Sequence, residues 1–452
     1  MRGKLLIVGL VSILFIFFVN KEIHAEEFKV TDEEELKTAL DLAKTDDVIL
    51  LGEGTYNGNF VIENTVTLIG EDGATIQGLD HGSVLTIHAD DVVIENLQIT
   101  GGGTQNAGIY VKSNRNRITN NRFYDVFHGV MVKDGYGNEI TNNMMTSLFD
   151  AKHKGFGVYL IEAPYSIVTE NIIYDSNDGI YISFSDLCEI TGNTIKKARY
   201  GVHTMDSENV IIAQNVISNS RNGLMIMQSY SIRIKENYLH SNTTVDGAGM
   251  FIFDTFDSTI SANIMEMNNK GIYLENALRN EILFNSFEGN DIGIEIGVDS
   301  NDNQINLNNF IGNTQQVISD KSNENSFTSN GYGNYWDNQS HLNINQDELN
   351  DYAYKSGDVF YNLTSDEPYL QLFTGSPAVR LWNTVEQYVP IPSNQFIVDE
   401  KPLIQPASIE VDIVGKQENK QQSIIWESFF FYVGLLCISV LIIGKTRRKQ
   451  DA

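Results

Sequence analysis

The stretch GIYISFSDLCEITGNTI, residues 179–195, contains the unit from which most of this chain is built. It opens with a glycine and alternating apolar residues, and it closes with an aliphatic-x-x-Asn-x-apolar pattern. The opening glycine recurs at intervals of 21 to 28 residues, most often 22, at Gly108, Gly129, Gly157, Gly179, Gly201, Gly223, Gly249, Gly271 and Gly293. A fixed period of this length indicates stacked units, each too small to bury a core alone.

Each unit predicts a short strand. The residues one and three places after the glycine, such as Ile180 and Ile182, are aliphatic and should point inward. Asn193 and its equivalents are expected to be turn residues with left-handed backbone, stacked so that their amides bond to one another. The two long intervals predict loops near Ser147–Phe156 and Ser241–Gly247. The fold class is therefore all-β: a right-handed parallel β-helix with short capping helices.

The remaining segments complete the predicted domain organisation. Thr31-Asp-Glu-Glu34 is a capping box that begins a helix, and Ser376-Pro377 begins another. From the N-terminus we expect an N-terminal capping helix within 26–45, the β-helix over 46–330, a C-terminal cap region over 331–389, and a proline-rich, polar linker over 390–425.

The two ends of the chain predict export and anchoring. Residues 1–25 have the cations, apolar run and small-residue cleavage site of a secretory signal. Residues 426–444 include 17 consecutive uncharged residues, Ser428–Gly444, and predict a C-terminal transmembrane helix. Four cations within residues 445–452 place this tail in the cytoplasm. The body is thus expected on the extracytoplasmic face of the cell membrane.

Composition excludes several kinds of site. The formal net charge of -28 argues against nucleic acid as a partner. The only two cysteines are Cys188, in a repeat, and Cys437, in the predicted anchor. An exported body with one cysteine forms no internal disulfide and offers no thiolate metal cage. Cys188 is most simply a residue that packs between coils.

The outward positions, two and four places after each glycine, predict a surface stripe. In order they are Tyr110/Lys112, Met131/Lys133, Tyr159/Ile161, Tyr181/Ser183, His203/Met205, Met225/Met227, Phe251/Phe253, Tyr273/Glu275 and Glu295/Gly297. An exposed stripe this apolar indicates a bound ligand or partner. The aromatic members most suited to such contact are Tyr159, Tyr181, Phe251 and Tyr273.

The centre of the stripe predicts a metal site. With 22 residues per coil, His203 should lie beside Met225 and Met205 beside Met227. One imidazole and three thioethers, without carboxylates, favour Cu(I) over zinc, calcium or magnesium. The alternative is that the methionines fill a hydrophobic face onto which a partner docks.

A second reading of the stripe is polysaccharide binding or cleavage, since aromatic ladders on β-helices suit sugars. Cleavage would need clustered carboxylates, and the stripe offers only Glu275 and Glu295. No Ser-His-Asp or phosphate-loop signature is present either. We therefore expect no catalytic activity from the β-helix itself.

Residues 30–405 resemble the NosD family, exported accessory proteins for maturation of nitrous oxide reductase. The resemblance lies in Asp46-Asp-Val-Ile-Leu-Leu-Gly-Glu-Gly-Thr-Tyr56, Val66-Thr-Leu-Ile-Gly70, Val92–Gly101, Gly201-Val-His-Thr-Met205, Gly223-Leu-Met-Ile-Met227, Gly333-Asn-Tyr-Trp336 and Leu372-Phe-Thr-Gly-Ser-Pro-Ala-Val379. It implies copper handling beside an ABC transporter permease and ATPase, a copper chaperone and the reductase. His203, Met205 and Met227 fall on family-type positions.

Three departures from the family pattern stand out. Met225 occupies a position where alanine is usual. In the acidic loop Asn343–Asp351, Glu348 replaces the glycine that permits a sharp turn, which argues against a calcium site. The C-terminal anchor is absent from many relatives, which are released into the periplasm.

Overall fold

The computed structural model describes residues 25–148, 153–319, 324–356, 368–373, 376–388 and 397–409. The chain divides into a unit ending at Val411 and a second unit from Asp412 to Ala452, and all described residues belong to the first. The predicted signal (but for Ala25), anchor (426–444) and tail (445–452) lie outside them. None of the helices within the described ranges is long and apolar enough to cross a membrane.

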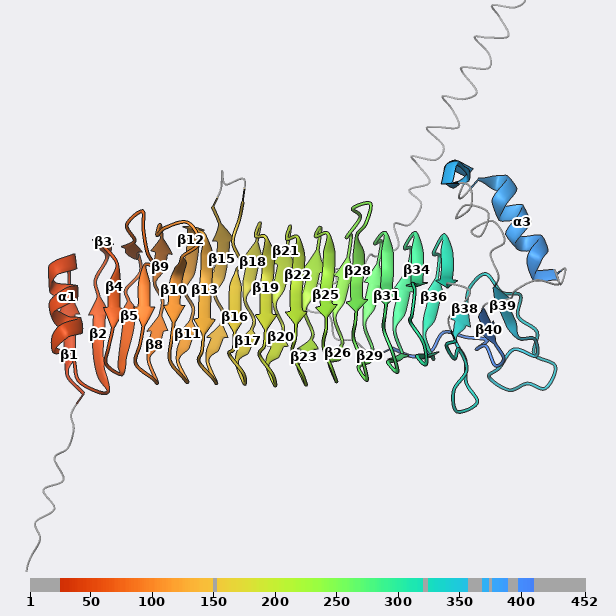
Figure 1. The fold of residues 1–452 in the computed structure, drawn as a ribbon, viewed down its shortest axis with the longest axis horizontal. Helices are drawn as coiled ribbons and strands as arrows, with labels where there is room; N and C mark the ends of the chain where they lie inside the picture. The colour runs from red at the N-terminus through yellow and green to blue at the C-terminus, as the bar shows by residue number, and fades with distance from the viewer. Residues whose placement is uncertain are drawn as a thin grey trace, which may run out of the picture. The chain divides into compact units, whose positions relative to one another are not determined.

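The first unit is a parallel β-helix of three sheets, as predicted (Figure 1). Sheet A contains β1 (Glu27–Val30), β2 (Asp47–Leu51), β5 (Val66–Gly70), β8 (Val93–Glu95), β11 (Arg117–Thr119), β14 (Glu139–Thr141), β17 (Ile167–Thr169), β20 (Glu189–Thr191), β23 (Ile211–Ala213), β26 (Arg233–Lys235), β29 (Thr259–Ser261), β32 (Glu281–Leu283) and β35 (Gln304–Asn306). Sheet B contains β3 (Gly54–Asn57), β6 (Ala74–Gln77), β9 (Gln98–Thr100), β12 (Arg122–Val126), β15 (Met144–Ser147), β18 (Ile172–Tyr174), β21 (Thr194–Lys196), β24 (Val216–Ser218), β27 (Tyr238–His240), β30 (Ile264–Glu266), β33 (Ser286–Glu288), β36 (Asn309–Ile311) and β38 (Tyr335–Trp336).

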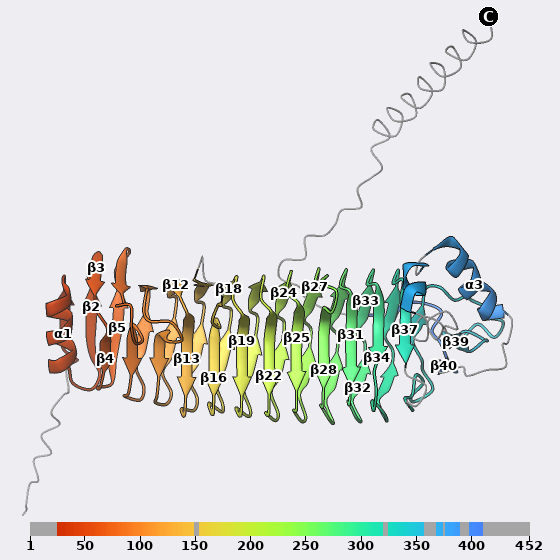
Figure 2. The ribbon, with the colours of Figure 1, turned by 45° about the horizontal axis from the view of Figure 1, so that its top comes forward.

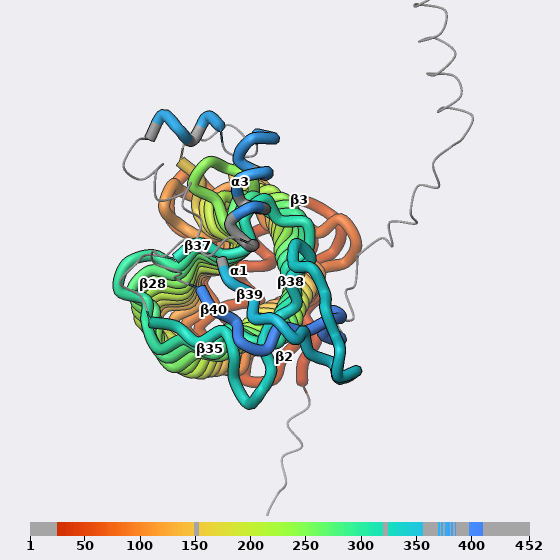
Figure 3. The backbone as a smooth tube through the Cα atoms, turned by 90° about the vertical axis from the view of Figure 1, so that its right-hand side faces the viewer, coloured from red at the N-terminus to blue at the C-terminus, as the bar shows by residue number. Residues whose placement is uncertain are grey.

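Sheet C, which carries the predicted stripe, completes each coil. Its strands are β4 (Phe60–Ile62), β7 (Leu85–Ile87), β10 (Ala107–Val111), β13 (His128–Lys133), β16 (Val158–Ile161), β19 (Asp178–Ser183), β22 (Tyr200–Met205), β25 (Asn222–Met227), β28 (Ala248–Phe253), β31 (Lys270–Glu275), β34 (Ile292–Ile296) and β37 (Gln315–Ser319). Each strand of sheet C after β4 pairs in parallel with the strand three earlier in the chain. The coils therefore overlie one another when viewed along the axis (Figure 3).

Close stacking explains the repeated glycine. A Cβ atom at Gly201 would lie 2.5 Å from the carbonyl oxygen of Gly223 in the next coil, too close for any side chain. The aliphatic residues that follow are fully buried, including Ile180 and Ile182. Cys188 is also buried, and burial raises the pKa of its thiol to about 12. The period is thus set by backbone contact between coils and by apolar burial inside them.

The asparagines form a buried ladder, as predicted, but they are not the left-handed residues. Asn193 Nδ2 donates to Asn215 Oδ1 at 3.0 Å, and the pattern repeats from Asn121 to Asn334. Positive φ angles occur at the preceding residue instead, as at Asn142 (55°) and Gly192 (67°). Left-handed backbone at that position turns the chain, which leaves the asparagine amide free to point inward and bond between coils.

The N-terminal coil is capped by a helix, with a strand that the sequence analysis did not predict. Strand β1 pairs with β2, and α1 (Glu33–Leu42) follows it. The N-cap is Asp32 rather than Thr31, because the Asp32 carboxylate accepts from the backbone N–H groups of Glu34 and Glu35. Thr31 instead donates to the Glu35 carboxylate.

The C-terminal coil is closed by stacked rings. Trp336 lies between Phe310 (centroids 4.3 Å apart) and Tyr354 (4.0 Å). Trp336 Nε1 and the backbone N–H of Asn334 donate to the buried Asp399 carboxylate at 2.9 and 2.7 Å, and burial raises the pKa of Asp399. Asp399 ends β40 (Ile397–Asp399), which pairs with β39 (Tyr354–Ser356). Residues 397–409, assigned to the linker from sequence, therefore belong to this cap.

The described residues between β39 and β40 include two short helices. They are η1 (Pro368–Phe373) and α3 (Pro377–Tyr388), the second beginning where Ser376-Pro377 predicted it. The apolar residues Val379, Trp382 and Val385, spaced three apart along α3, are buried only in part. Val379 is 8% exposed, whereas Trp382 is 50% and Val385 49% exposed.

Candidate metal centre

Strands β19, β22, β25 and β28 bring the histidine and methionines together. Cα pairing places His203 beside Met225 and Met205 beside Met227, as the 22-residue period predicted. Figure 2 shows these strands in consecutive coils. One row across sheet C is continuous and reads Tyr159, Tyr181, His203, Met225, Phe251 and Tyr273.

The row lies on the outer face of the β-helix, but it is less exposed than expected. The alternate residues Val202 and Leu224 fill the core and are 0% exposed. On the outer face His203 is 6% and Met225 5% exposed, while Met205 and Met227 are half-buried. Outward side chains pack on their neighbours one coil away, with the Tyr181 and His203 rings 4.7 Å apart.

His203 is held through one ring nitrogen only. Its Nδ1 lies 2.9 Å from Oδ2 of Asp178, whose side chain is fully buried. Arg199 donates two hydrogen bonds to the same carboxylate, from Nε to Oδ1 and from Nη2 to Oδ2, both at 2.8 Å. The other nitrogen, Nε2, is buried and has no hydrogen-bond partner among the described residues. A buried polar atom without a partner is costly, so Nε2 is where a ligand fits best.

The three thioethers differ in their surroundings. Met205 Sδ accepts a hydrogen bond from Tyr181 Oη at 3.5 Å and stays half-buried. Met225 Sδ accepts from Asn222 Nδ2 at 3.6 Å beneath the surface. Met227 is half-buried. Met225 is therefore the least accessible of the three thioethers, and the more accessible thioethers on this face are those of Met205 and Met227.

This set has the chemistry of a soft-metal site. Imidazole nitrogen and thioether sulfur suit Cu(I), whereas calcium and magnesium require oxygen donors. Within the described ranges, no group of three or more His, Cys, Asp or Glu residues is arranged to hold a metal ion.

Asp178, which contacts His203, and Arg199, which holds Asp178, were not predicted from the sequence. Asp178 stands immediately before Gly179, outside the positions two and four places after the glycine. A second diagonal pair uses the same positions, since Lys270, before Gly271, bonds to Glu295 at 2.7 Å. In each of these two pairs one partner, Asp178 or Lys270, stands immediately before the repeated glycine. That position is therefore the sequence signal that could have revealed both pairs.

The stripe continues toward the N-terminus as an aromatic cluster. The Phe156 ring contacts the His128 ring (centroids 5.2 Å apart), the Tyr159 ring (4.8 Å) and the Tyr181 ring (5.2 Å). Phe156 ends the first long interval, for which a loop near Ser147–Phe156 was predicted. Residues 149–152 of that interval lie outside the described ranges. This cluster is continuous with His203 through Tyr181, whose ring lies 4.7 Å from the imidazole.

His128 should make stability depend on pH. Its Nδ1 accepts from the Phe156 backbone N–H at 3.0 Å, and burial lowers its pKa from 6.5 to about 4. The unfolded chain binds the proton more readily, so this contribution is complete above pH 6.5 and is lost as pH falls to about 4. The loss amounts to about 3 kcal/mol. We expect His128→Asn, whose Oδ1 can still accept, to reduce the fall in unfolding free energy between pH 7 and 4 by about that amount. Equal falls in both proteins would contradict this.

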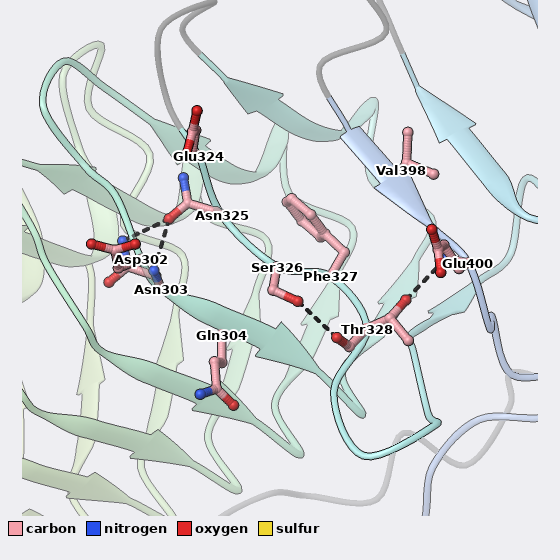
Figure 4. Close-up of a pocket in the computed structure, with 10 residues that line it drawn as sticks. All are labelled: Asp302, Asn303, Gln304, Glu324, Asn325, Ser326, Phe327, Thr328, Val398 and Glu400. Atoms are coloured by element: carbon pink, nitrogen blue, oxygen red, sulfur yellow. Dashed lines mark hydrogen bonds between the residues drawn. The ribbon is translucent and has the colours of Figure 1, made fainter.

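A separate recess lies at the C-terminal end. Its volume is about 750 Å³, and it is bounded by β35, residues 324–328 and β40 (Figure 4). The lining residues are Asp302, Asn303, Gln304, Glu324, Asn325, Ser326, Phe327, Thr328, Val398 and Glu400. They supply hard oxygen atoms, in contrast to the soft donors of sheet C.

Comparison with known proteins places this architecture in a family. Residues 145–340 match the family model described as "Periplasmic copper-binding protein (NosD)", and residues 54–186 match "Right handed beta helix region". The "Probable ABC transporter binding protein NosD" of Pseudomonas aeruginosa is 34% identical over 384 residues, covering 80% of this chain and 89% of the relative. The protein of that name from Stutzerimonas stutzeri is 34% identical over 378 residues, covering 78% and 86%.

Solved structures share the fold at low identity. The mannuronan C-5 epimerase AlgE6 A-module of Azotobacter vinelandii has a TM-score of 0.51 at 12% identity, covering 66% of this chain and 95% of that one. The DFA-IIIase of Arthrobacter chlorophenolicus has a TM-score of 0.51 at 12% identity, covering 68% and 99%. These likenesses show the fold alone. The 34% identity to the two relatives extends over most of their length and shows common family membership. The chain therefore belongs to the NosD family of right-handed parallel β-helix proteins.

Proposed function

We propose that this NosD-family protein handles copper outside the cytoplasm, holding Cu(I) at His203, Met205 and Met227. The observation that carries the proposal is the buried, unpartnered Nε2 of His203. It lies on the same face of sheet C as two half-buried thioethers in adjacent coils. The copper-binding description of the matched family model supports the choice of metal.

The residues around the donors suit a soft, monovalent ion. Asp178 and Arg199 form an ion pair whose charges cancel, so the carboxylate that contacts His203 carries no uncompensated charge. The neighbouring side chains in the row, Tyr181 and Phe251, are aromatic and limit water access. Bound here, Cu(I) would be stored or passed on, and we assign the β-helix no catalytic step of its own.

The names of the relatives support a proposal for the cellular role. Both are named ABC transporter binding proteins, and we extend that association to this chain. On this proposal the partners are the transporter permease and ATPase, a copper chaperone and nitrous oxide reductase, whose copper centre would be matured. Residues 426–444 would anchor the protein to the membrane with its β-helix on the extracytoplasmic face.

The direct test is X-ray absorption spectroscopy of the full-length protein loaded with Cu(I) under reducing conditions. We expect one copper per chain, with nitrogen and sulfur scatterers in the first coordination sphere. An absence of stoichiometric binding, or a sphere of oxygen atoms alone, would overturn the site. Purification with the transporter subunits from a native membrane would test the association separately.

A further inference from the structure

Asp178 is a buried carboxylate whose surroundings point to a specific task. Its side chain is 0% exposed, and both oxygens are engaged by the Arg199 fork at 2.8 Å. Oδ2 also faces Nδ1 of His203 at 2.9 Å. A buried charge persists only when it is paired and hydrogen-bonded. Here the pairing fixes the carboxylate in position and presents one oxygen to the imidazole.

This contact determines which nitrogen of His203 carries the proton. An ionised carboxylate can only accept a hydrogen bond, so Nδ1 must donate. In a neutral imidazole, the lone pair then lies on Nε2. Nε2 is the atom that is buried without a hydrogen-bond partner in the described part of the chain. The Asp178 contact and the unpartnered Nε2 are independent observations, and they agree.

We infer that Asp178, oriented by Arg199, is a positioning residue that holds His203 in the tautomer with Nε2 available to Cu(I). The inference rests on the proposed function. Asp178 does not bind the metal, and it acts through the imidazole ring. Carboxylates that accept from a metal-binding histidine orient the ring and raise its donor strength, and their loss typically weakens metal binding 10- to 100-fold.

The chain contains a matched control for this arrangement. Asp257 is held by Arg279 through the same two-pronged contact, with both distances 2.7 Å. That pair lies at an exposed turn, with about half of each side chain accessible. Asp257→Asn therefore removes an equivalent ion pair away from His203. Its comparison with Asp178→Asn separates loss of a salt bridge from loss of the imidazole contact.

The experiment measures the tautomer directly, without copper. Full-length protein labelled with ¹⁵N at its eight histidines is examined by long-range proton–nitrogen NMR, and His203→Gln identifies the His203 signals. We expect the wild type and Asp257→Asn to carry the proton on Nδ1. In Asp178→Asn the new amide can donate to Nδ1, so the proton should move to Nε2. Cu(I) affinity should fall 10- to 100-fold in Asp178→Asn only.

The outcomes separate this inference from the proposed function. A proton on Nε2 in the wild type would overturn the inference, and that result does not depend on whether Asp178→Asn folds. An unchanged Cu(I) affinity in Asp178→Asn would also overturn it, leaving Asp178 with only a structural role in its ion pair with Arg199. If the wild type carries the proton on Nδ1 but binds no Cu(I), the proposed function fails while the tautomer assignment stands.

Discussion

A variant carrying His203→Ala, Met205→Leu and Met227→Leu is expected to bind Cu(I) at least about 100-fold more weakly than the wild type. That factor corresponds to about 2.7 kcal/mol of binding free energy. The three changes remove the imidazole nitrogen and both accessible thioethers. Leucine matches methionine closely in volume, so the outer face of β22 and β25 stays packed. The core residues Val202 and Leu224 are untouched.

The measurement is a competition titration against a Cu(I) chelator, with circular dichroism to confirm that β content is retained. Two single variants serve as controls. Met131→Leu removes a thioether at the same outward position in β13, four coils before Met225. Met225→Leu removes the buried thioether whose sulfur already accepts from Asn222. Both controls should bind Cu(I) with wild-type affinity. If the triple variant also bound Cu(I) as tightly as the wild type, the copper site would be refuted.

The repeat made the register of this site predictable from sequence, because a constant coil length places residue n beside residue n + 22. His203 beside Met225 and Met205 beside Met227 follow from arithmetic alone. Exposure was not predictable in the same way. It depends on how far each outward side chain covers its neighbours, and the 4.7 Å contact of Tyr181 with His203 buries the imidazole.

Asp178 could not be found from the alternation of inward and outward positions. Asp178 is the first residue of β19, where strict alternation with Ile180 would turn its side chain inward, yet its carboxylate contacts His203, 25 residues later. The C-terminal cap was missed for a different reason. Ile397–Asp399 pairs with Tyr354–Ser356 across about 40 residues, and Asp399 binds Trp336 from 63 residues away. Contacts outside the period leave no periodic signal in the sequence.

The asparagine ladder should contribute more to stability than any surface feature, and Asn143→Leu tests this. Asn143 is 1% exposed, and its Oδ1 accepts from the backbone N–H and the amide of Asn121. Its Nδ2 donates to the carbonyls of Ile118 and Thr141 and to Asn171 Oδ1. Leucine leaves several of these buried groups unpaired, at about 1–3 kcal/mol each. We expect the free energy of unfolding to fall by about 4 kcal/mol or more.

The neighbouring residue supplies the control for that measurement. Asn142 is exposed, has a φ of 55°, and bonds to the next coil through its backbone N–H to the Thr169 carbonyl. Asn142→Gly keeps that hydrogen bond and places a residue suited to left-handed backbone there. The free energy of unfolding, measured by chemical denaturation, should therefore change by less than about 0.5 kcal/mol. If both substitutions cost the same, the ladder amides stabilise the coils no more than an exposed turn does. A large loss at Asn143 alone would show that the side-chain hydrogen bonds of the ladder stabilise the stacked coils beyond what their backbone pairing provides.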